Sequence, residues 1–374
     1  MKLHKFSLFF FVFLSCNFSA KQDSTENTSI HLQKKETAFY LDEVKPFTYF
    51  SIFQSKGDDC FAYVKNNKII IINLADPKDK DSLSIVFDDK QPDKFGILHS
   101  FCFNGKDSLF LLFSDALLVV VKSHLNKIIP INDLDTVQFN KIRLENLEEA
   151  PIYYDSKTNE IVGQVYCSEC GMANSSFYKQ NTIGRISLQT NKFETYNISY
   201  PQNYIDNYYG FAMHVYINSY DTFSLISFPC NSNIFLLNRY TNKVKAYNAK
   251  SKYQTEEAEP LDTISKNSTE DKMRHLATVP YYAEILYDKY RGLYYRFFRK
   301  NIPLKQPNGK YNDFTNKPTI LIVLNKQFEV IGEYELNDLK NSYYSFVGEA
   351  GLYLKESKSD SLGKTKFRVF KFEQ

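Results

Sequence analysis

The chain has 374 residues, and its acidic and basic residues are interspersed along the sequence with a formal net charge of +3. Proteins that bind nucleic acid gather Lys and Arg on one face, so this balance predicts no nucleic-acid partner. The 13 Gly are scattered, which argues against a glycine-rich phosphate-binding loop. The 32 Phe and 28 Tyr occur without any Trp, the usual platform for stacking sugars.

A largely apolar run close to the N-terminus predicts export. Lys2 and Lys5 flank the start of this run, which covers residues 6–14. The run is too short to cross a hydrocarbon core of about 30 Å, and the layout is that of a secretory signal. We therefore expect residues 1–15 to be a signal peptide, and no later apolar run is long enough to span a membrane.

A cysteine directly after this run predicts lipid attachment. Ser15 and Cys16 resemble the lipobox of bacterial lipoproteins, in which the cysteine thiol is acylated and becomes the new N-terminus. Phe13 departs from the Leu or Val that is usual in this motif. Plain secretion with cleavage after Ala20 is the alternative, although bulky Phe18 fits such a cleavage site poorly. We expect a membrane anchor at Cys16, followed by a polar, flexible tether over residues 16–35.

From residue 36 to residue 374 the sequence predicts one all-β domain. Short runs rich in Val, Ile, Phe and Tyr alternate with Asn, Asp and Gly, as at 69–72, 109–113 and 117–121. No stretch keeps the apolar spacing of a helix over a helical length.

A repeated segment indicates the architecture. Residues 190–197 and 241–248 share the pattern Thr-Asn-Lys, apolar, two variable residues, Tyr-Asn, and weaker copies occur near Asn126 and Asn325. Each copy predicts a hairpin near the outer edge of a sheet, and four-stranded units that recur every 40–50 residues or so are typical of a β-propeller. We expect six such units, at 47–87, 96–131, 148–198, 210–248, 279–337 and 342–374. Seven units are the alternative. The last unit has three good strands, so we expect residues 37–41 to supply its fourth strand and close the ring.

The cysteines do not predict a disulfide-rich scaffold, because an odd number of them follows Cys16. Cys167 and Cys170 form a C-x-x-C pair, which we interpret as a structural disulfide or inert thiols. A zinc site completed by Cys230 and His214, or a redox dithiol, are the alternatives. We predict no metal and no cofactor.

Three segments stand out together: the signal that ends at Cys16, the aromatic stretch 280–299, and the closing segment 351–353. Together they resemble an uncharacterised lipoprotein family of Bacteroidota, a domain of unknown function with a TolB-like six-bladed β-propeller. The resemblance implies this fold and a place in the cell envelope, and it transfers no catalytic residue. Because Asp23 is the first acid after Cys16, unlike in many surface-exported Bacteroidota lipoproteins, we expect an outer-membrane lipoprotein on the periplasmic side.

Few residues suggest a ligand site. His214, Arg296 and Arg299 lie in runs that should otherwise be apolar, so each is either packed in the core or turned toward the central channel. Residues 249–278 form a long polar insertion, either a lid near the channel mouth or a loop without function. Common catalytic motifs are missing. We expect a non-enzymatic binding or scaffold protein for a peptide, glycan or protein partner, with a propeller-type lyase or hydrolase as the alternative.

Overall fold

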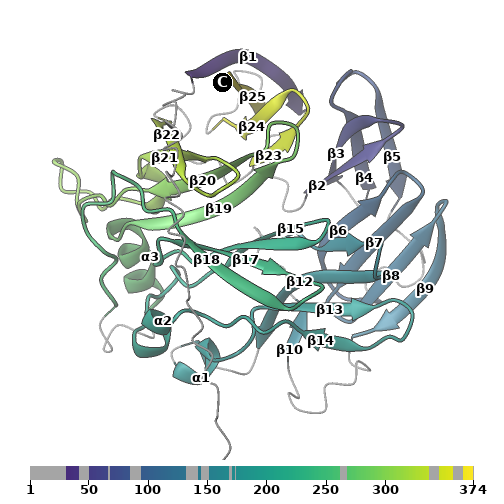
Figure 1. Cartoon of the computed structure of the whole chain (residues 1–374), viewed down its shortest axis with the longest axis horizontal. Coiled ribbons are helices and arrows are strands. Elements are labelled where there is room, and N and C mark those ends of the chain that lie inside the picture. Colours follow the sequence, from purple (N-terminus) through teal and green to yellow (C-terminus); the bar gives the residue numbers. More distant parts are fainter. Residues whose placement is uncertain are drawn as a thin grey trace, which may run out of the picture.

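The computed structural model describes residues 31–41, 50–65, 68–84, 94–131, 142–144, 151–167, 171–172, 174–261, 268–336, 345–356 and 365–373. Within these residues the strands form six antiparallel sheets, which follow one another around a ring (Figure 1). First strands of several neighbouring sheets contact each other, as β2 does with β6 and β15 with β19, so these strands lie nearest the axis of the ring. The six-bladed β-propeller predicted from the sequence is confirmed, and the seven-bladed alternative is wrong.

The first three blades cover residues 50–195. Blade 1 contains β2 (Phe50–Ser55), β3 (Asp58–Lys65), β4 (Lys68–Asn73) and β5 (Lys80–Ser84). Blade 2 contains β6 (Leu98–Asn104), β7 (Ser108–Phe113), β8 (Ala116–Val121) and β9 (His124–Pro130). Blade 3 contains β10 (Ile142–Leu144), β11 (Tyr153–Asp155), β12 (Glu160–Cys167), β13 (Ile183–Ser187) and β14 (Phe193–Thr195). Because β10 pairs with β12, blade 3 begins earlier than the residue 148 predicted for it.

The remaining blades complete the ring. Blade 4 contains β15 (Tyr216–Tyr220), β16 (Phe223–Ser227), β17 (Asn233–Asn238) and β18 (Lys243–Asn248). Blade 5 contains β19 (Tyr281–Asp288), β20 (Leu293–Arg299), β21 (Thr319–Leu324) and β22 (Val330–Glu335). Blade 6 contains β23 (Ser345–Gly348), β24 (Gly351–Lys355), β25 (Thr365–Glu373) and, as its outermost strand, β1 (His31–Leu41).

The N-terminal strand closes the ring, as predicted, but it is longer than expected. β1 pairs antiparallel with β25 from His31 opposite Glu373 to Leu41 opposite Thr365, with an irregularity between Lys35 and Phe39. Residues 31–35 were expected in the tether and instead belong to this strand. The outermost strand of a blade is held mainly by backbone hydrogen bonds along one edge, so the polar sequence of residues 31–36 gave no apolar pattern to detect.

The repeated turn was interpreted correctly at three of its four copies. Asn191 and Asn242 sit in the β13–β14 and β17–β18 turns, with left-handed φ values of 56° and 50° that Asn tolerates well. Asn325 lies in the β21–β22 turn. Asn126 does not mark a turn, because it lies within β9, and the chain reverses at Lys122 and Ser123.

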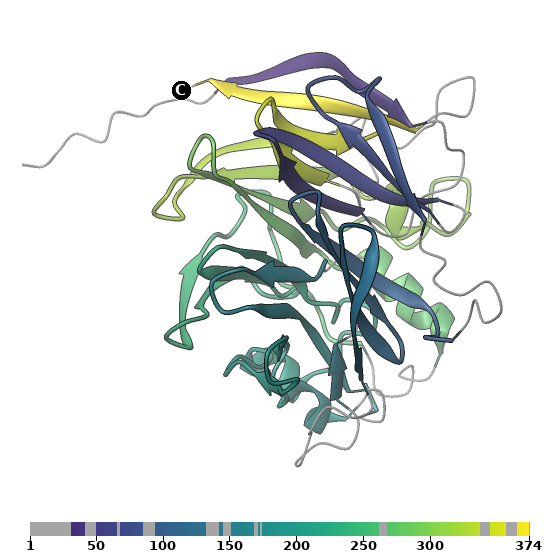
Figure 2. The same cartoon turned by 90° about the vertical axis from the view of Figure 1, so that its right-hand side faces the viewer.

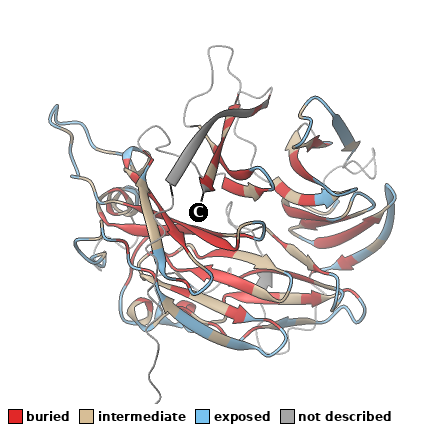
Figure 3. Cartoon of the chain, turned by 45° about the horizontal axis from the view of Figure 1, so that its top comes forward, coloured by how far each residue is buried: buried red, intermediate tan, exposed pale blue. Residues whose placement is uncertain are grey.

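Aromatic side chains fill the spaces between blades. Figure 3 shows that buried residues, drawn in red, run along the strands of the sheets. Between blades 6 and 1, Phe39 stacks on Phe367 with ring centroids 4.9 Å apart, and Phe346 stacks on Tyr353 at 4.6 Å. Phe61 of blade 1 packs against Phe346 at 5.1 Å. The closing strand is therefore held by aromatic packing as well as by its backbone pairing.

The propeller has two different faces. Because neighbouring strands are antiparallel, two sets of turns lie at one end of the sheets, which we call the hairpin face. These are the turns between the innermost and second strands, and the turns between the third and fourth strands of blades 1 to 5. The connections between the second and third strands, and those between blades, begin and end at the opposite end. The helices α1 (Ser175–Tyr178), α2 (Gln202–Asp206), α3 (Thr269–Thr278) and the 3-10 helix η2 (Phe314–Asn316) are in these other connections, so we call this end the helix-bearing face. Figure 2 shows α3 on one side of the molecule and the C-terminus on the other.

The start of β1 lies on the hairpin face, because His31 pairs with Glu373 at the end of β25. Among the described residues no helix is long and apolar enough to cross a membrane. Cys16 and the predicted signal peptide lie outside the described residues.

Candidate functional site

The described parts of the insertion, 249–261 and 268–278, and the β20–β21 connection, 300–318, pack together on the helix-bearing face, and we call them the cap. Its helix α3 starts at Ser268, whose hydroxyl accepts a hydrogen bond from the Asp271 backbone N–H at 3.2 Å. Glu270 and Asp271 in the first turn also favour a helix start, because carboxylates stabilise the positive end of the helix dipole. A sequence search for apolar spacing misses this helix, since most of its residues are polar.

The cap is joined to the entry of blade 4 by backbone contacts. The Leu261 N–H donates to the Tyr208 carbonyl at 2.7 Å. Within the cap, His275 Nε2 lies 2.7 Å from the Glu259 carbonyl oxygen. Gly210 has a φ of +56°, and a side chain there would meet Leu261 and Lys272 at 3.4 Å. Glycine therefore lets the cap lie close to the segment that leads into β15.

Lys317 fixes the end of α3 to blade 5. Its side chain is fully buried, and its ammonium donates to the carbonyls of Leu276 and Ala277, both at 3.0 Å, and of Val279. Burial and, to a smaller extent, the charge of the neighbouring Arg299 lower the pKa of Lys317 to about 7. A cation at this position satisfies carbonyls that the helix leaves without partners.

Arg296 lies inside the wall between blades 4 and 5. The residue is fully buried, and its guanidinium sits 3.8 Å from the ring centroid of Tyr282. It donates to Ser227 Oγ at 3.0 Å and to the Asn231 carbonyl at 2.9 Å. These contacts place Arg296 in a packing role, and burial lowers its pKa to about 9.

Arg299 points to the other side of the same blade. It is 2% exposed and donates to Thr319 Oγ1. Near it, Glu284 of the inner strand β19 is buried and accepts a hydrogen bond from Ser345 Oγ of blade 6 at 2.9 Å. Burial raises the pKa of Glu284, and the charge of Arg299 opposes part of that rise. The two arginines are therefore not brought together, and each is enclosed by its own pair of blades.

His214 lies just before the inner strand β15, on the side of the helix-bearing face. The residue is partly exposed, whereas its Nδ1 is buried and has no hydrogen-bond partner among the described residues. Burial lowers the pKa of the imidazole, which favours its neutral form at pH 7. Its ring lies parallel to that of Phe211, with centroids 6.3 Å apart.

Three described cysteines are free thiols. Cys60 and Cys102 are buried, and Cys230 is a free thiol whose Sγ lies 3.7 Å from the Ala212 carbonyl. Burial raises the pKa of the Cys230 thiol to about 12. Cys167 ends β12 and Cys170 lies outside the described residues, so their pairing stays a prediction. Among the described residues no group of three or more His, Cys, Asp or Glu side chains is placed to hold a metal ion.

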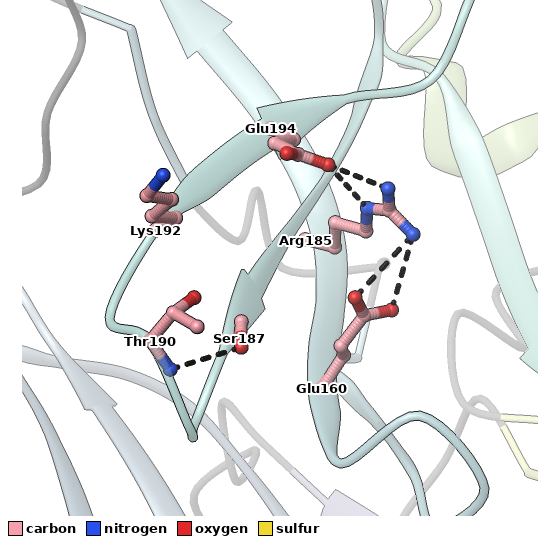
Figure 4. A pocket seen from close by; sticks show the side chains of 6 residues that line it. All are labelled: Glu160, Arg185, Ser187, Thr190, Lys192 and Glu194. Atoms are coloured by element: carbon pink, nitrogen blue, oxygen red, sulfur yellow. Dashed lines mark hydrogen bonds and ion pairs between the residues drawn. The ribbon is translucent and has the colours of Figure 1, made fainter.

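A shallow pocket of about 240 Å³ lies on blade 3 (Figure 4). In it Arg185 pairs with Glu194 at 2.5 Å and with Glu160 at 3.3 Å. Ser187, Thr190 and Lys192 complete the lining. Since its arginine is already held by two carboxylates of the same sheet, the pocket is an ion-paired part of the blade surface.

The sequence reasoning missed two buried carboxylates on the hairpin face. Asp155 at the end of β11 pairs with Arg239 of blade 4 at 2.9 Å, and both side chains are almost fully buried. Asp288 at the end of β19 accepts from the Tyr295 hydroxyl at 2.7 Å and pairs with Arg291 at 2.9 Å. A signal was present, because a Tyr-Asp pair ends the inner strand of three consecutive blades, at 154–155, 220–221 and 287–288.

A third buried carboxylate joins three blades at the place where the ring closes. Asp59 of blade 1 accepts hydrogen bonds from the Tyr290 hydroxyl of blade 5 at 2.6 Å and from the Glu349 backbone N–H of blade 6 at 2.7 Å. Arg291 donates to the Glu349 carbonyl at 2.7 Å. The buried charged groups on the hairpin face therefore hold neighbouring blades of the ring together.

The fold and this arrangement define a six-bladed β-propeller that is closed by its N-terminal strand and capped on one face. A family model described as a domain of unknown function, DUF4221, matches residues 104–335. The chain belongs to the DUF4221 family. A crystal structure of a family member from Bacteroides vulgatus is 19% identical, with a TM-score of 0.72, and the match covers 93% of this chain and 100% of that one.

Other solved structures are less similar. Regucalcin from Agrobacterium tumefaciens, a calcium-binding protein, is 11% identical with a TM-score of 0.41 over 89% of this chain and 93% of that one. Hydrazine synthase from Kuenenia stuttgartiensis is 12% identical with a TM-score of 0.39 over 86% and 75%. These likenesses are too low to carry an argument about function. No curated protein matches the sequence.

Proposed function

We propose that this protein is a cell-envelope lipoprotein of the outer membrane, on the periplasmic side, whose helix-bearing face binds a peptide, glycan or protein partner without catalysis. One observation carries the proposal. The helices and the long connections that depart from a plain propeller gather on one face, opposite the end at which the N-terminal strand begins. Loops on a rigid scaffold are where binding residues usually lie.

The cap offers an exposed surface suited to recognition. Met273 of α3 is 37% exposed, and Leu304 and Tyr311 of the β20–β21 connection are 39% and 49% exposed. The guanidinium of Arg274 lies 4.3 Å from the ring centroid of Tyr311, which joins the helix to this connection. Exposed aliphatic and aromatic side chains beside a cation are typical of the centre of a binding surface.

The proposed lipid anchor at Cys16 supports a location in the cell envelope. Residues 17–30 separate Cys16 from β1, so the propeller would stand close to the membrane with its cap directed away from the anchor point. Fractionation of cells tests this part. Wild-type protein should be found with the membrane, and the Cys16→Ala variant should be released; membrane-bound, normally processed Cys16→Ala protein would contradict lipid attachment.

A peptide and glycan array probed with the full chain tests recognition. The variant Leu304→Asp/Tyr311→Ala should lose the bound ligands, because it removes the exposed contacts of the cap. The variant Val330→Asp/Tyr240→Ala is the matched control, since these residues are 38% and 45% exposed but lie near hairpin-face turns. Equal loss in both variants would contradict a site on the cap, and cleavage of an array compound would favour the lyase or hydrolase alternative.

A further inference from the structure

His275 of α3 joins the two described parts of the insertion. The residue is 9% exposed, and its Nε2 lies 2.7 Å from the carbonyl oxygen of Glu259. Because a carbonyl oxygen only accepts hydrogen bonds, Nε2 carries the proton of the neutral imidazole. The other ring nitrogen, Nδ1, is buried and makes no hydrogen bond to any described residue. A second proton would therefore have to enter at a buried atom that lacks a hydrogen-bond partner.

A cation lies close to the same end of α3. The Lys317 ammonium donates to the carbonyls of the residues that follow His275, which are Leu276, Ala277 and Val279. Three carbonyls take up the three N–H groups of an ammonium, so this contact suits the charged form of the lysine. Since its pKa is about 7, Lys317 is charged throughout the acid range.

The described carboxylates near α3 are paired elsewhere or exposed. Glu270 and Asp271 pair with Arg274 on the open side of the helix, and Glu257 pairs with Lys250. No described carboxylate forms an ion pair with His275. The other ionisable groups on the elements packed against this end of the helix are Lys272 of α3, Tyr208 and Tyr209 at the entry to blade 4, Glu256 and Glu259 of the insertion, Cys230 before β17, Tyr281 of β19, Arg299 of β20 and Asp313 before η2.

The imidazole is therefore harder to protonate in the docked helix than in a released one. Burial lowers the pKa of His275 from its ordinary value of 6.5; the backbone of Glu259 opposes part of this shift, and the charge of Lys317 adds to it. A released helix exposes the ring, which then titrates near 6.5. Because the docked state binds fewer protons, the contribution of His275 to docking is complete above about pH 6.5. It is lost as the pH falls through the lower pKa of the docked state.

The helix that His275 holds carries part of the exposed surface of the cap. Met273 is 37% exposed, and the guanidinium of Arg274 lies 4.3 Å from the ring centroid of Tyr311. We propose that His275 is an acid-sensitive latch, whose protonation releases α3 from the segment 249–261. Release separates Arg274 from Tyr311 and weakens binding at the cap, a second step that rests on the proposed function.

Hydrogen exchange of the full chain at pH 7.5 and pH 5.0, corrected for the intrinsic effect of pH, tests the latch. The amides of α3 should open up to about thirtyfold more at pH 5.0, which is the limit for one group that titrates near 6.5 only in the released state. The strands β20 and β21 below the cap should keep their protection.

Two variants with the same chemical change give the control. His275→Gln keeps a donor for the Glu259 carbonyl but takes up no proton, so the opening of its α3 should not depend on pH. His124→Gln alters an exposed histidine of β9 and should behave like wild type. Circular dichroism establishes that both variants are folded. Nitrogen NMR of histidine-labelled wild type needs no variant: one imidazole should hold its proton on Nε2 and gain a second in step with the exchange of α3.

The outcomes separate the latch from the binding function. An α3 that exchanges equally at both pH values, or that opens in acid in His275→Gln as in wild type, overturns the latch. Loss of protection in all blades at pH 5.0 also overturns it, because the whole propeller then unfolds. The peptide and glycan array is probed at both pH values. Compounds that wild type binds only at pH 7.5 and His275→Gln binds at both support the second step, and equal binding by wild type overturns it. An array without any bound compound contradicts the binding function, whereas exchange alone decides the latch.

Discussion

Removal of the Asp155 carboxylate should be among the most destabilising single changes outside the apolar core. The side chains of Asp155 and Arg239 are 3% and 1% exposed, and their contact at 2.9 Å ties blade 3 to blade 4. Arg239 also donates to the Phe223 carbonyl at 2.7 Å and lies 4.9 Å from the ring centroid of Tyr153. In Asp155→Ala these neutral groups remain, but the buried guanidinium loses its counter-charge.

The expected loss follows from that geometry. Breaking a buried ion pair by removing one partner costs about 3–5 kcal/mol, because the remaining charge stays desolvated. Asp155 also accepts from the Lys157 backbone N–H at 3.0 Å, so the turn after β11 is weakened as well. Urea unfolding followed by circular dichroism measures the difference. The double variant Asp155→Ala/Arg239→Met should recover much of the loss, since it removes the unpaired charge.

An exposed pair provides the control. Lys250 and Glu257 are 2.8 Å apart with side chains 45% and 69% exposed, so Glu257→Ala should cost less than about 1 kcal/mol. If Asp155→Ala were as mild as this control, the reasoning from burial and charge would be refuted. A double variant that is less stable than Asp155→Ala would show that the packing of Arg239 matters more than its charge.

Four further predictions concern other parts of the fold. Deletion of residues 17–30 should leave the melting temperature unchanged, whereas deletion of 17–41 should lower it by exposing the edge of β25; equal melting temperatures would contradict closure by β1. Because the pKa of Lys317 is about 7 in the folded chain and an unfolded lysine titrates near 10.5, the unfolded state binds more protons between these values, so the contribution of this residue to stability should rise from pH 7 to pH 10. The difference in unfolding free energy between wild type and Lys317→Met should show that rise, and a pH-independent difference would contradict it. Cys230 should react with a thiol reagent only after unfolding, since burial raises its pKa to about 12; fast labelling of the native protein would contradict this. Arg296→Ala should lower the melting temperature through lost packing on Tyr282, and an unchanged melting temperature with lost ligand binding would assign Arg296 to recognition instead.

The sequence predicted the parts of the fold that depend on local chemistry. Turns built on Asn191 and Asn242 are recognisable because Asn favours the left-handed backbone that they need. The second and third strands of blades were visible as apolar runs, as at 69–72, 109–113 and 117–121, since both of their sides pack against neighbouring blades. Residues 31–35 were not recognisable as strand, because they are mostly polar and their pairing partner lies at the other end of the chain.

The candidate site was less predictable, because its residues depend on contacts distant in sequence. Arg296 was expected either to pack in the core or to face the central channel. Its hydrogen bonds to the carbonyls of Asn231 and Asn233 show that it packs. No motif in the sequence marks Lys317, and its burial follows from the carbonyls at the end of α3. The helix α3 could not be predicted from the polar composition of the insertion. The sequence signal for α3 is its N-terminal capping residues and not an apolar stripe.

The closing strand has a consequence for the order of folding. β1 leaves the ribosome first, yet its partner β25 is the last strand to appear. Until the whole chain is available, the aromatic residues that surround Phe39 have no complete core, and the edge of β25 cannot be covered. The final step of folding should therefore join the two ends of the chain, with the amides of β25 the last to become protected in a pulsed hydrogen-exchange experiment. If Cys16 is acylated early, as proposed, the lipid would hold the N-terminal side of β1 at the membrane until β25 is available to pair with it.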